Sequence, residues 1–146
     1  MGLDDDIYII DVNGRNIQNL TNHPGHDKLP AWSPDSQKIA FCSKREGNYN
    51  IYVIDVDGKN LRQLTDHPDR DLSPTWSPNG KEIALSSRRG GNYDIYVMNA
   101  DGTNLRQLTN HPADDWAPTF GFTVGLVVPP IGKQTTMWGG LKQNRK

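Results

Sequence analysis

The sequence repeats itself with a period of 44 residues. The dipeptide Ile-Tyr stands at positions 7, 51 and 95. Later motifs keep this spacing: Asn-Gly or Asp-Gly at 13, 57 and 101, Leu-Thr at 20, 64 and 108, and His-Pro at 23, 67 and 111. Pro-x-Trp-Ser-Pro occurs at 30–34 and again at 74–78. A period of this length is typical of a unit that cannot bury its apolar face alone and stacks on its neighbours.

Each repeat predicts four short strands. In the middle copy these strands are expected at 73–76, 83–87, 95–98 and 104–108, where β-branched and aromatic residues gather. Turn signals separate them, including Ser77-Pro78-Asn79-Gly80 and the Asp101-Gly102 pair. Four antiparallel strands in about 40–50 residues form one blade of a β-propeller. The expected fold class is therefore all-β, built of propeller blades.

Composition and charge exclude several classes of function. The apolar share of 34% favours disorder, but 16 basic and 17 acidic residues leave a net charge of only −1. Disorder usually needs strong self-repulsion as well as low hydrophobicity. The near-neutral charge also gives no basic face for nucleic acid. No apolar run approaches the ~20 residues that cross a bilayer. We expect a folded chain with no nucleic-acid partner and no membrane span.

The repeats do not begin and end at blade boundaries. The predicted domain is a partial propeller over residues 1–130, followed by a tail without repeat character over 131–146. It divides into a half blade at 5–21, blades at 29–65 and 73–109, and a half blade at 116–130. About three blades cannot surround an axis, because small propellers need about four. Two identical chains would close a ring of six with a shared inter-chain blade. The alternative is a fragment of a longer propeller.

Several linked motifs resemble a known family. Pro-x-Trp-Ser-Pro is followed by Ile-Ala, by Asn-Tyr-x-Ile-Tyr-Val and by Asp-Gly-x-Asn-x-Arg-Gln-Leu-Thr. This string is similar to the WD-like repeat of TolB-type β-propellers over roughly residues 5–120. The resemblance implies blades closed into a ring, often of six, and no single activity. It also implies a bacterial periplasmic protein, whereas the first residues, Met1 to Asp6, lack the features of a secretory signal.

One face of the propeller gathers the candidate binding residues. In propeller geometry, the loop leading to each innermost strand lies on the same face as the loop between the second and third strands. Because the aspartates precede the innermost strands, we expect them at the mouth of the central channel, where binding sites are common. The predicted residues of this face are His23, Asp27, Lys28, Arg45, His67, Asp71, Arg89, His111, Asp115 and Trp116.

These residues have two interpretations. A ring of carboxylates from Asp27, Asp71 and Asp115 would hold a hard cation such as Ca²⁺ or contact a cationic peptide. Alternatively, each aspartate accepts backbone N–H bonds and each His-Pro shapes its loop. Recurrence in every copy favours this structural interpretation. Lys28 and Trp116 break the repeat, so they are candidates for partner contact, and a tryptophan there would equally cap the core.

The arginines and the function remain to be assigned. Arg45 and Arg89 are expected to bridge neighbouring blades or nearby carboxylates. The chain has no Gly-x-Ser-x-Gly, His-Glu-x-x-His, phosphate-loop or Cys-x-x-Cys motif. The sequence therefore favours a non-enzymatic scaffold that binds a protein or peptide and needs no cofactor. Some propellers resembling this family carry a metal-dependent lyase site built from channel histidines. That resemblance keeps a metal-binding or lyase-like protein open, with His23, His67 and His111 as the positions concerned.

Overall fold

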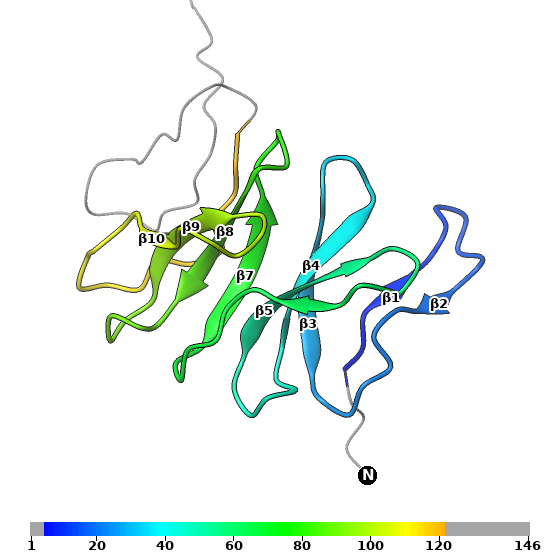
Figure 1. The fold of residues 1–146 in the computed structure, drawn as a ribbon, viewed down its shortest axis with the longest axis horizontal. Coiled ribbons are helices and arrows are strands. Elements are labelled where there is room, and N and C mark those ends of the chain that lie inside the picture. Colours follow the sequence, from blue (N-terminus) through cyan, green and yellow to red (C-terminus); the bar gives the residue numbers. More distant parts are fainter. Residues whose placement is uncertain (1–4, 122–146) are drawn as a thin grey trace, which may run out of the picture.

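Three antiparallel sheets stand side by side in a computed structural model that describes residues 5–121 (Figure 1). A half blade consists of β1 (Tyr8–Ile9) and β2 (Gln18–Asn19). Blade 1 consists of β3 (Asp27–Trp32), β4 (Lys38–Ser43), β5 (Asn50–Asp55) and β6 (Arg62–Gln63). Blade 2 consists of β7 (Asp71–Trp76), β8 (Glu82–Ser87), β9 (Asp94–Asn99) and β10 (Arg106–Gln107). The strand order within each blade follows the sequence. The predicted all-β class is confirmed for the described residues.

The innermost strands carry a bulge at the same repeat position. The β3–β4 register shifts between Lys28 and Ala31, and the β7–β8 register shifts between Leu72 and Thr75. Within the bulges, Leu29 has φ 54° and Ser73 has φ 53°. The next residue in each case is a proline, which has no N–H to donate to a ladder. A bulge therefore accommodates a proline inside a strand that is otherwise paired.

The hydrophobic core lies between the sheets. Side chains alternate along a strand, so each blade has two buried faces. One face of blade 1 packs on the half blade through Ile39, Phe41, Tyr52 and Ile54, which meet Ile7 and Leu20. The other face packs on blade 2; this cluster contains Ala40, Cys42, Ile51, Val53, Trp76, Ile83, Leu85, Tyr96 and Met98. No blade has a core of its own, as the repeat predicts.

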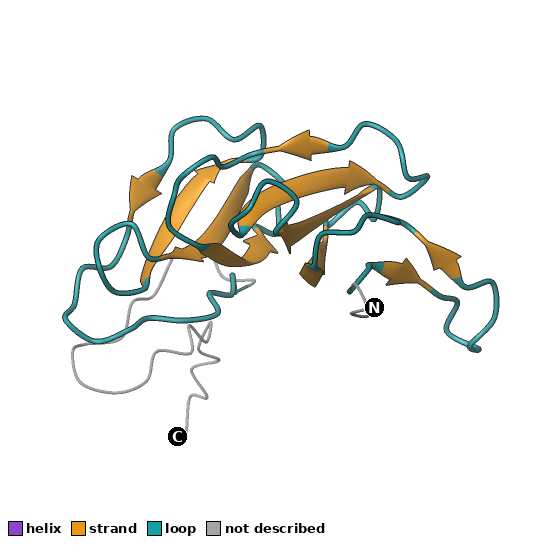
Figure 2. Ribbon diagram, turned by 90° about the horizontal axis from the view of Figure 1, so that it is seen from below, coloured by secondary structure: helices purple, strands orange, loops and turns teal. Residues whose placement is uncertain are grey.

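The segment after blade 2 repeats the start of an innermost strand. The Asp115 N–H donates to the Tyr93 carbonyl at 2.6 Å, as Asp71 does to Tyr49 at 2.9 Å. Ala117 has φ 50°, close to the values at the two bulges. Figure 2 shows this segment running back below blade 2, at the opposite end of the arc from the half blade. The rest of the predicted half blade, 122–130, and the tail at 131–146 lie outside the described residues.

Cys42 is expected to be chemically inert in the folded protein. Its side chain has no exposed surface, and burial raises the pKa of the thiol to about 11. At pH 8 a thiol with this pKa would be only about one-thousandth thiolate, the form that reacts. Ellman's reagent should therefore leave the native chain unmodified and label about one thiol in urea. Rapid labelling without denaturant would contradict this burial.

Candidate binding face at the His-Pro loops

Two of the predicted aspartates are held by arginines of their own blade. Asp27, at the start of β3, accepts from Nη2 of Arg45 at 3.2 and 3.0 Å. Asp71, at the start of β7, accepts from Arg89 at 3.1 and 3.0 Å. Both aspartate side chains are fully buried, and the arginines are 9% and 20% exposed. A buried carboxylate needs such a charged, hydrogen-bonded partner.

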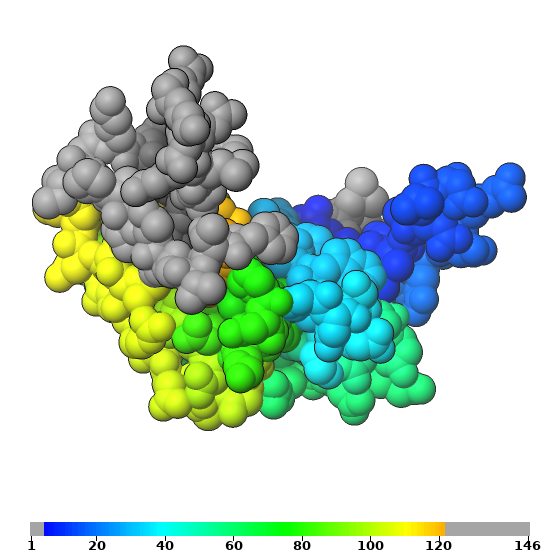
Figure 3. Space-filling model, turned by 90° about the horizontal axis from the view of Figure 1, so that it is seen from above, coloured from blue at the N-terminus to red at the C-terminus, as the bar shows by residue number. Residues whose placement is uncertain are grey.

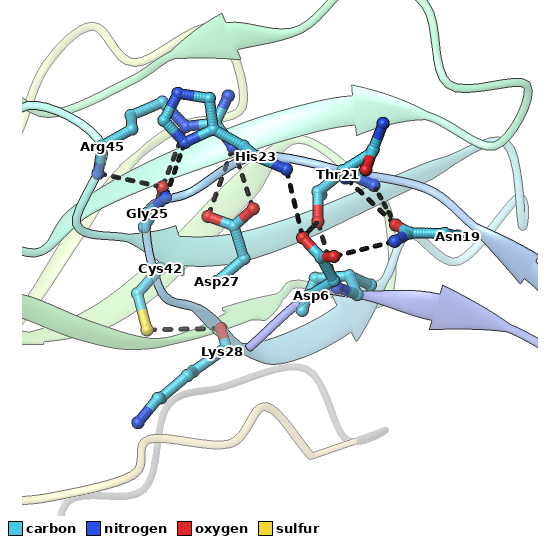
Figure 4. Close-up of polar contacts among 12 residues, drawn as sticks. Asp6, Asn19, Thr21, His23, Gly25, Asp27, Lys28, Cys42 and Arg45 are labelled. Atoms are coloured by element: carbon cyan, nitrogen blue, oxygen red, sulfur yellow. Dashed lines mark hydrogen bonds and ion pairs between the residues drawn. The ribbon is translucent and has the colours of Figure 1, made fainter. Parts of the chain in front are cut away.

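The arginines are themselves fixed in position. The Nε of Arg45 donates to Ser43 Oγ at 2.8 Å, and Arg89 makes the same bond to Ser87. The Arg45 guanidinium lies 4.8 Å from the Tyr52 ring centroid, a cation–π distance. Figure 4 shows Asp27 and Arg45 together within blade 1. As expected, each arginine pairs with a carboxylate, and that carboxylate belongs to the same blade. These two carboxylates are thus occupied as ion-pair partners.

The three His-Pro histidines have one shared local role. Nδ1 of His23 accepts the backbone N–H of Gly25 at 2.9 Å. Nδ1 of His67 accepts from Asp69, and Nδ1 of His111 from Ala113, both at 3.1 Å. In each copy the imidazole closes a turn over the residue two positions on, which is how short polar side chains shape loops. This geometry agrees with the structural interpretation of the motif.

Side chains from the segments just before β1, β5 and β9 also hold the loops. Asn92 Nδ2 donates to the carbonyls of His111 and Ala113 at 2.7 and 3.2 Å. Asn48 makes the equivalent bonds to His67 and Asp69. In the first copy Asp6 accepts the N–H of His23, a contact visible in Figure 4. Each His-Pro loop is therefore a hydrogen-bonded unit attached to the segment just before β1, β5 or β9.

Lys28 and Trp116, which break the repeat, each contact the residue 23 positions earlier in the sequence. Lys28 Nζ lies 2.9 Å from the Asp5 carboxylate, and its hydrogen bond lowers the pKa of that carboxyl. Trp116 occupies the corresponding place in the third copy and packs on Tyr93, with ring centroids 3.8 Å apart. Trp116 nevertheless stays 43% exposed. Both residues thus make structural contacts and still keep exposed surface.

The arrangement within residues 5–121 offers no ready metal site. No three His, Cys, Asp or Glu side chains in that range are grouped so as to hold a metal ion. Asp115 is partly buried at the start of the third copy, and its N–H bonds Tyr93. The same range contains no helix long and apolar enough to cross a membrane. The roles of the ten predicted residues in binding stay predictions.

A cavity that was not predicted from the sequence lies at the ends of the strands opposite to the His-Pro loops. It has a volume of about 590 Å³ and sits between the two blades, with Asp35, Lys38, Arg62, Trp76 and Asp101 in its lining. Arg62 reaches across to the Ala100 carbonyl at 3.2 Å. The Ser33 hydroxyl donates to Asp35 and lowers the pKa of its carboxyl. Because two blades must pack to form it, no local motif indicates this cavity.

Comparison with known proteins places the chain in a family. The family model described as the TolB beta propeller domain matches residues 2–122. The fold of stacked four-stranded sheets and this match define a TolB-type β-propeller. The chain belongs to the TolB beta propeller domain family, as the repeat motifs predicted. No curated protein matches it.

Solved structures agree with this assignment. A putative TolB from Agrobacterium tumefaciens is 28% identical with a TM-score of 0.71, and the match covers 78% of this chain and 41% of that one. TolB from Acinetobacter baumannii is 29% identical with a TM-score of 0.66, covering 77% and 29%. An oligogalacturonate lyase in complex with manganese is 20% identical, with a TM-score of 0.59 and coverage of 75% and 30%. That last likeness concerns the fold alone. The matches span less than half of the length of each of these proteins.

Proposed function

We propose that this chain is a non-enzymatic scaffold that binds a protein or peptide. Two copies assemble into one six-bladed propeller with a shared inter-chain blade. TolB proteins among the similar structures support a scaffold over an enzyme. The face of the His-Pro loops, where Lys28 and Trp116 keep exposed surface, is the side assigned to the partner.

One observation carries the proposed assembly. Tyr8 and Ile10 in the half blade are 56% and 52% exposed. Their equivalents 44 residues on, Tyr52 and Ile54, are each 3% exposed because they face a preceding sheet. The half blade thus presents a surface that elsewhere in the repeat is a blade–blade interface. Leaving apolar surface and a strand edge open favours association.

The mass in solution tests the assembly. Light scattering behind a sizing column, at micromolar concentration, should give about twice the 16.4 kDa of one chain. A stable monomer at this concentration would contradict the proposed dimer. A mass of more than two chains would contradict a six-bladed ring made of two copies.

Metal content tests the non-enzymatic scaffold. Purified protein should contain no stoichiometric metal, and a chelator should leave its melting temperature unchanged. The physical reason is that Asp27 and Asp71 are already paired with arginines. One bound metal per chain, with a melting temperature that falls by many degrees on chelation, would support a metal-dependent protein instead.

A further inference from the structure

The two equivalent tryptophans of the innermost strands have different surroundings. Trp76 in β7 is only 9% exposed, and its indole Nε1 donates to the Ala31 carbonyl of blade 1 at 3.2 Å. Trp32 in β3 occupies the same repeat position but is 51% exposed. Blade 2 has the innermost strand of blade 1 beside it. Among residues 5–121, blade 1 has only the two outer strands of the half blade beside it, so no innermost strand of this range lies next to Trp32.

A glycine shows that the half blade also lacks a neighbour, on its own preceding side. Gly58 and Gly102 end equivalent turns, and each lies against a leucine of the preceding sheet: Leu20 and Leu64, respectively. Gly14 ends the first of these turns with a similar φ of 75°, yet a side chain added there would meet no atom of residues 5–121 within 4 Å. Figure 3 shows the half blade at one end of the molecule, next to blade 1. Among the described residues, the half blade thus lacks a preceding sheet at its outer side, and blade 1 lacks an innermost neighbour at Trp32.

The chain itself carries the strand start that fits beside Trp32. Ala31 accepts the indole bond from Trp76, and its equivalents in the later copies are Thr75 and Thr119. Thr119 is exposed and follows the buried Pro118, the counterpart of the buried Pro74 in β7. The Ala117 N–H donates to Ser86 Oγ at 3.1 Å, which holds this segment on blade 2. Residues 115–121 thus stand where the next innermost strand begins.

We propose that Trp32 docks against residues 117–120 of a second copy and that its indole donates to the Thr119 carbonyl of that copy. This inference rests on the proposed dimer and adds its register, that is, which residues of one copy contact which residues of the other. Each chain contributes an innermost strand start to the shared blade and receives one beside its own Trp32. A two-fold ring makes the contact twice, because such interfaces are reciprocal.

A photoreactive side chain tests the register directly. A benzophenone amino acid is placed at position 32, and equal amounts of ¹⁵N-labelled and unlabelled chains are mixed, denatured together and refolded before irradiation. Position 32 should crosslink to the tryptic peptide 107–133, which contains Thr119, and the labels should show a bond between different chains. The probe at position 76 should instead reach peptide 29–38 of its own chain, since Trp76 bonds Ala31. At Leu61, exposed on blade 1, the probe should not reach 107–133.

The outcomes separate this inference from the proposed function. A dimer by light scattering whose position 32 crosslinks elsewhere would keep the assembly and overturn the register. A monomer would remove both. A bond from 32 to 107–133 within one chain would also overturn the inference.

A substitution series gives the same test as an affinity. Trp32→Ala should raise the dimer dissociation constant at least about tenfold, because a central tryptophan is a frequent interface anchor. Leu61→Ala, a change at another exposed apolar side chain, should leave the constant unchanged. Equal constants for the wild type and Trp32→Ala would count against the docking of Trp32.

Discussion

Replacing Arg89 by alanine is expected to lower the free energy of unfolding by about 3–5 kcal/mol, because it leaves the buried Asp71 carboxylate without its charged partner. The Asp71 side chain has no exposed surface, and Nη2 of Arg89 donates hydrogen bonds to both of its carboxylate oxygens. Arg89 also bonds Ser87 Oγ and lies 5.0 Å from the Tyr96 ring centroid. Urea denaturation at a fixed protein concentration measures the loss, since urea does not screen the ion pair.

Two further variants make the result specific to the buried pair. Arg106→Ala removes an ion pair with Glu82 whose side chains are 57% and 37% exposed. Exposed pairs contribute about 0–1 kcal/mol, so this control should change little. The double variant Asp71→Leu with Arg89→Met should lose less stability than Arg89→Ala alone, because it leaves no uncompensated charge. If Arg89→Ala and Arg106→Ala lower the free energy of unfolding by the same amount, the buried pair of Asp71 and Arg89 does not stabilise the fold in this way.

Much of the fold follows from the period of the sequence. A repeat of 44 residues with four strand-forming runs indicates a blade, and the alternation along Ile51 to Ile54 gives each blade two apolar faces. The bulges were not predicted. They need a positive φ at Leu29 and Ser73, residues that do not usually mark such a conformation. Pro30 and Pro74 were the available signal, since proline inside a paired strand requires an irregularity.

The binding face was less predictable than the blades. The partner of Asp27 is Arg45, 18 residues on, and Asp71 pairs with Arg89 at the same offset. This recurring offset was a signal in the sequence that pointed to the pair. The contact of Lys28 with Asp5 had no such signal, because the third copy replaces it with stacking of Trp116 on Tyr93. A contact whose chemistry changes between copies is hidden from a search for repeats.

The half blade should fold as part of the same unit as the two blades. Its Ile7 and Leu20 are buried against Phe41 of blade 1, as Leu85 of blade 2 is buried against the other face of that blade. Repeat proteins gain stability from such interfaces between neighbours rather than from each unit alone. A loss at one interface should therefore weaken the whole described stack and not only release its first two strands.

Phe41→Ala and its repeat equivalent Leu85→Ala test this continuity. Both side chains are fully buried, so we expect losses in unfolding free energy of about 3–5 kcal/mol for Phe41 and about 2–5 kcal/mol for Leu85. Phe41 also stacks on Tyr52, with centroids 6.0 Å apart. Urea transitions followed by far-UV circular dichroism and by tryptophan fluorescence should coincide in both variants. Leu61→Ala, at an exposed site on blade 1, should cost less than about 1 kcal/mol. An early, separate transition in Phe41→Ala alone would show that the half blade detaches by itself, and the open face would then belong to a weakly docked hairpin.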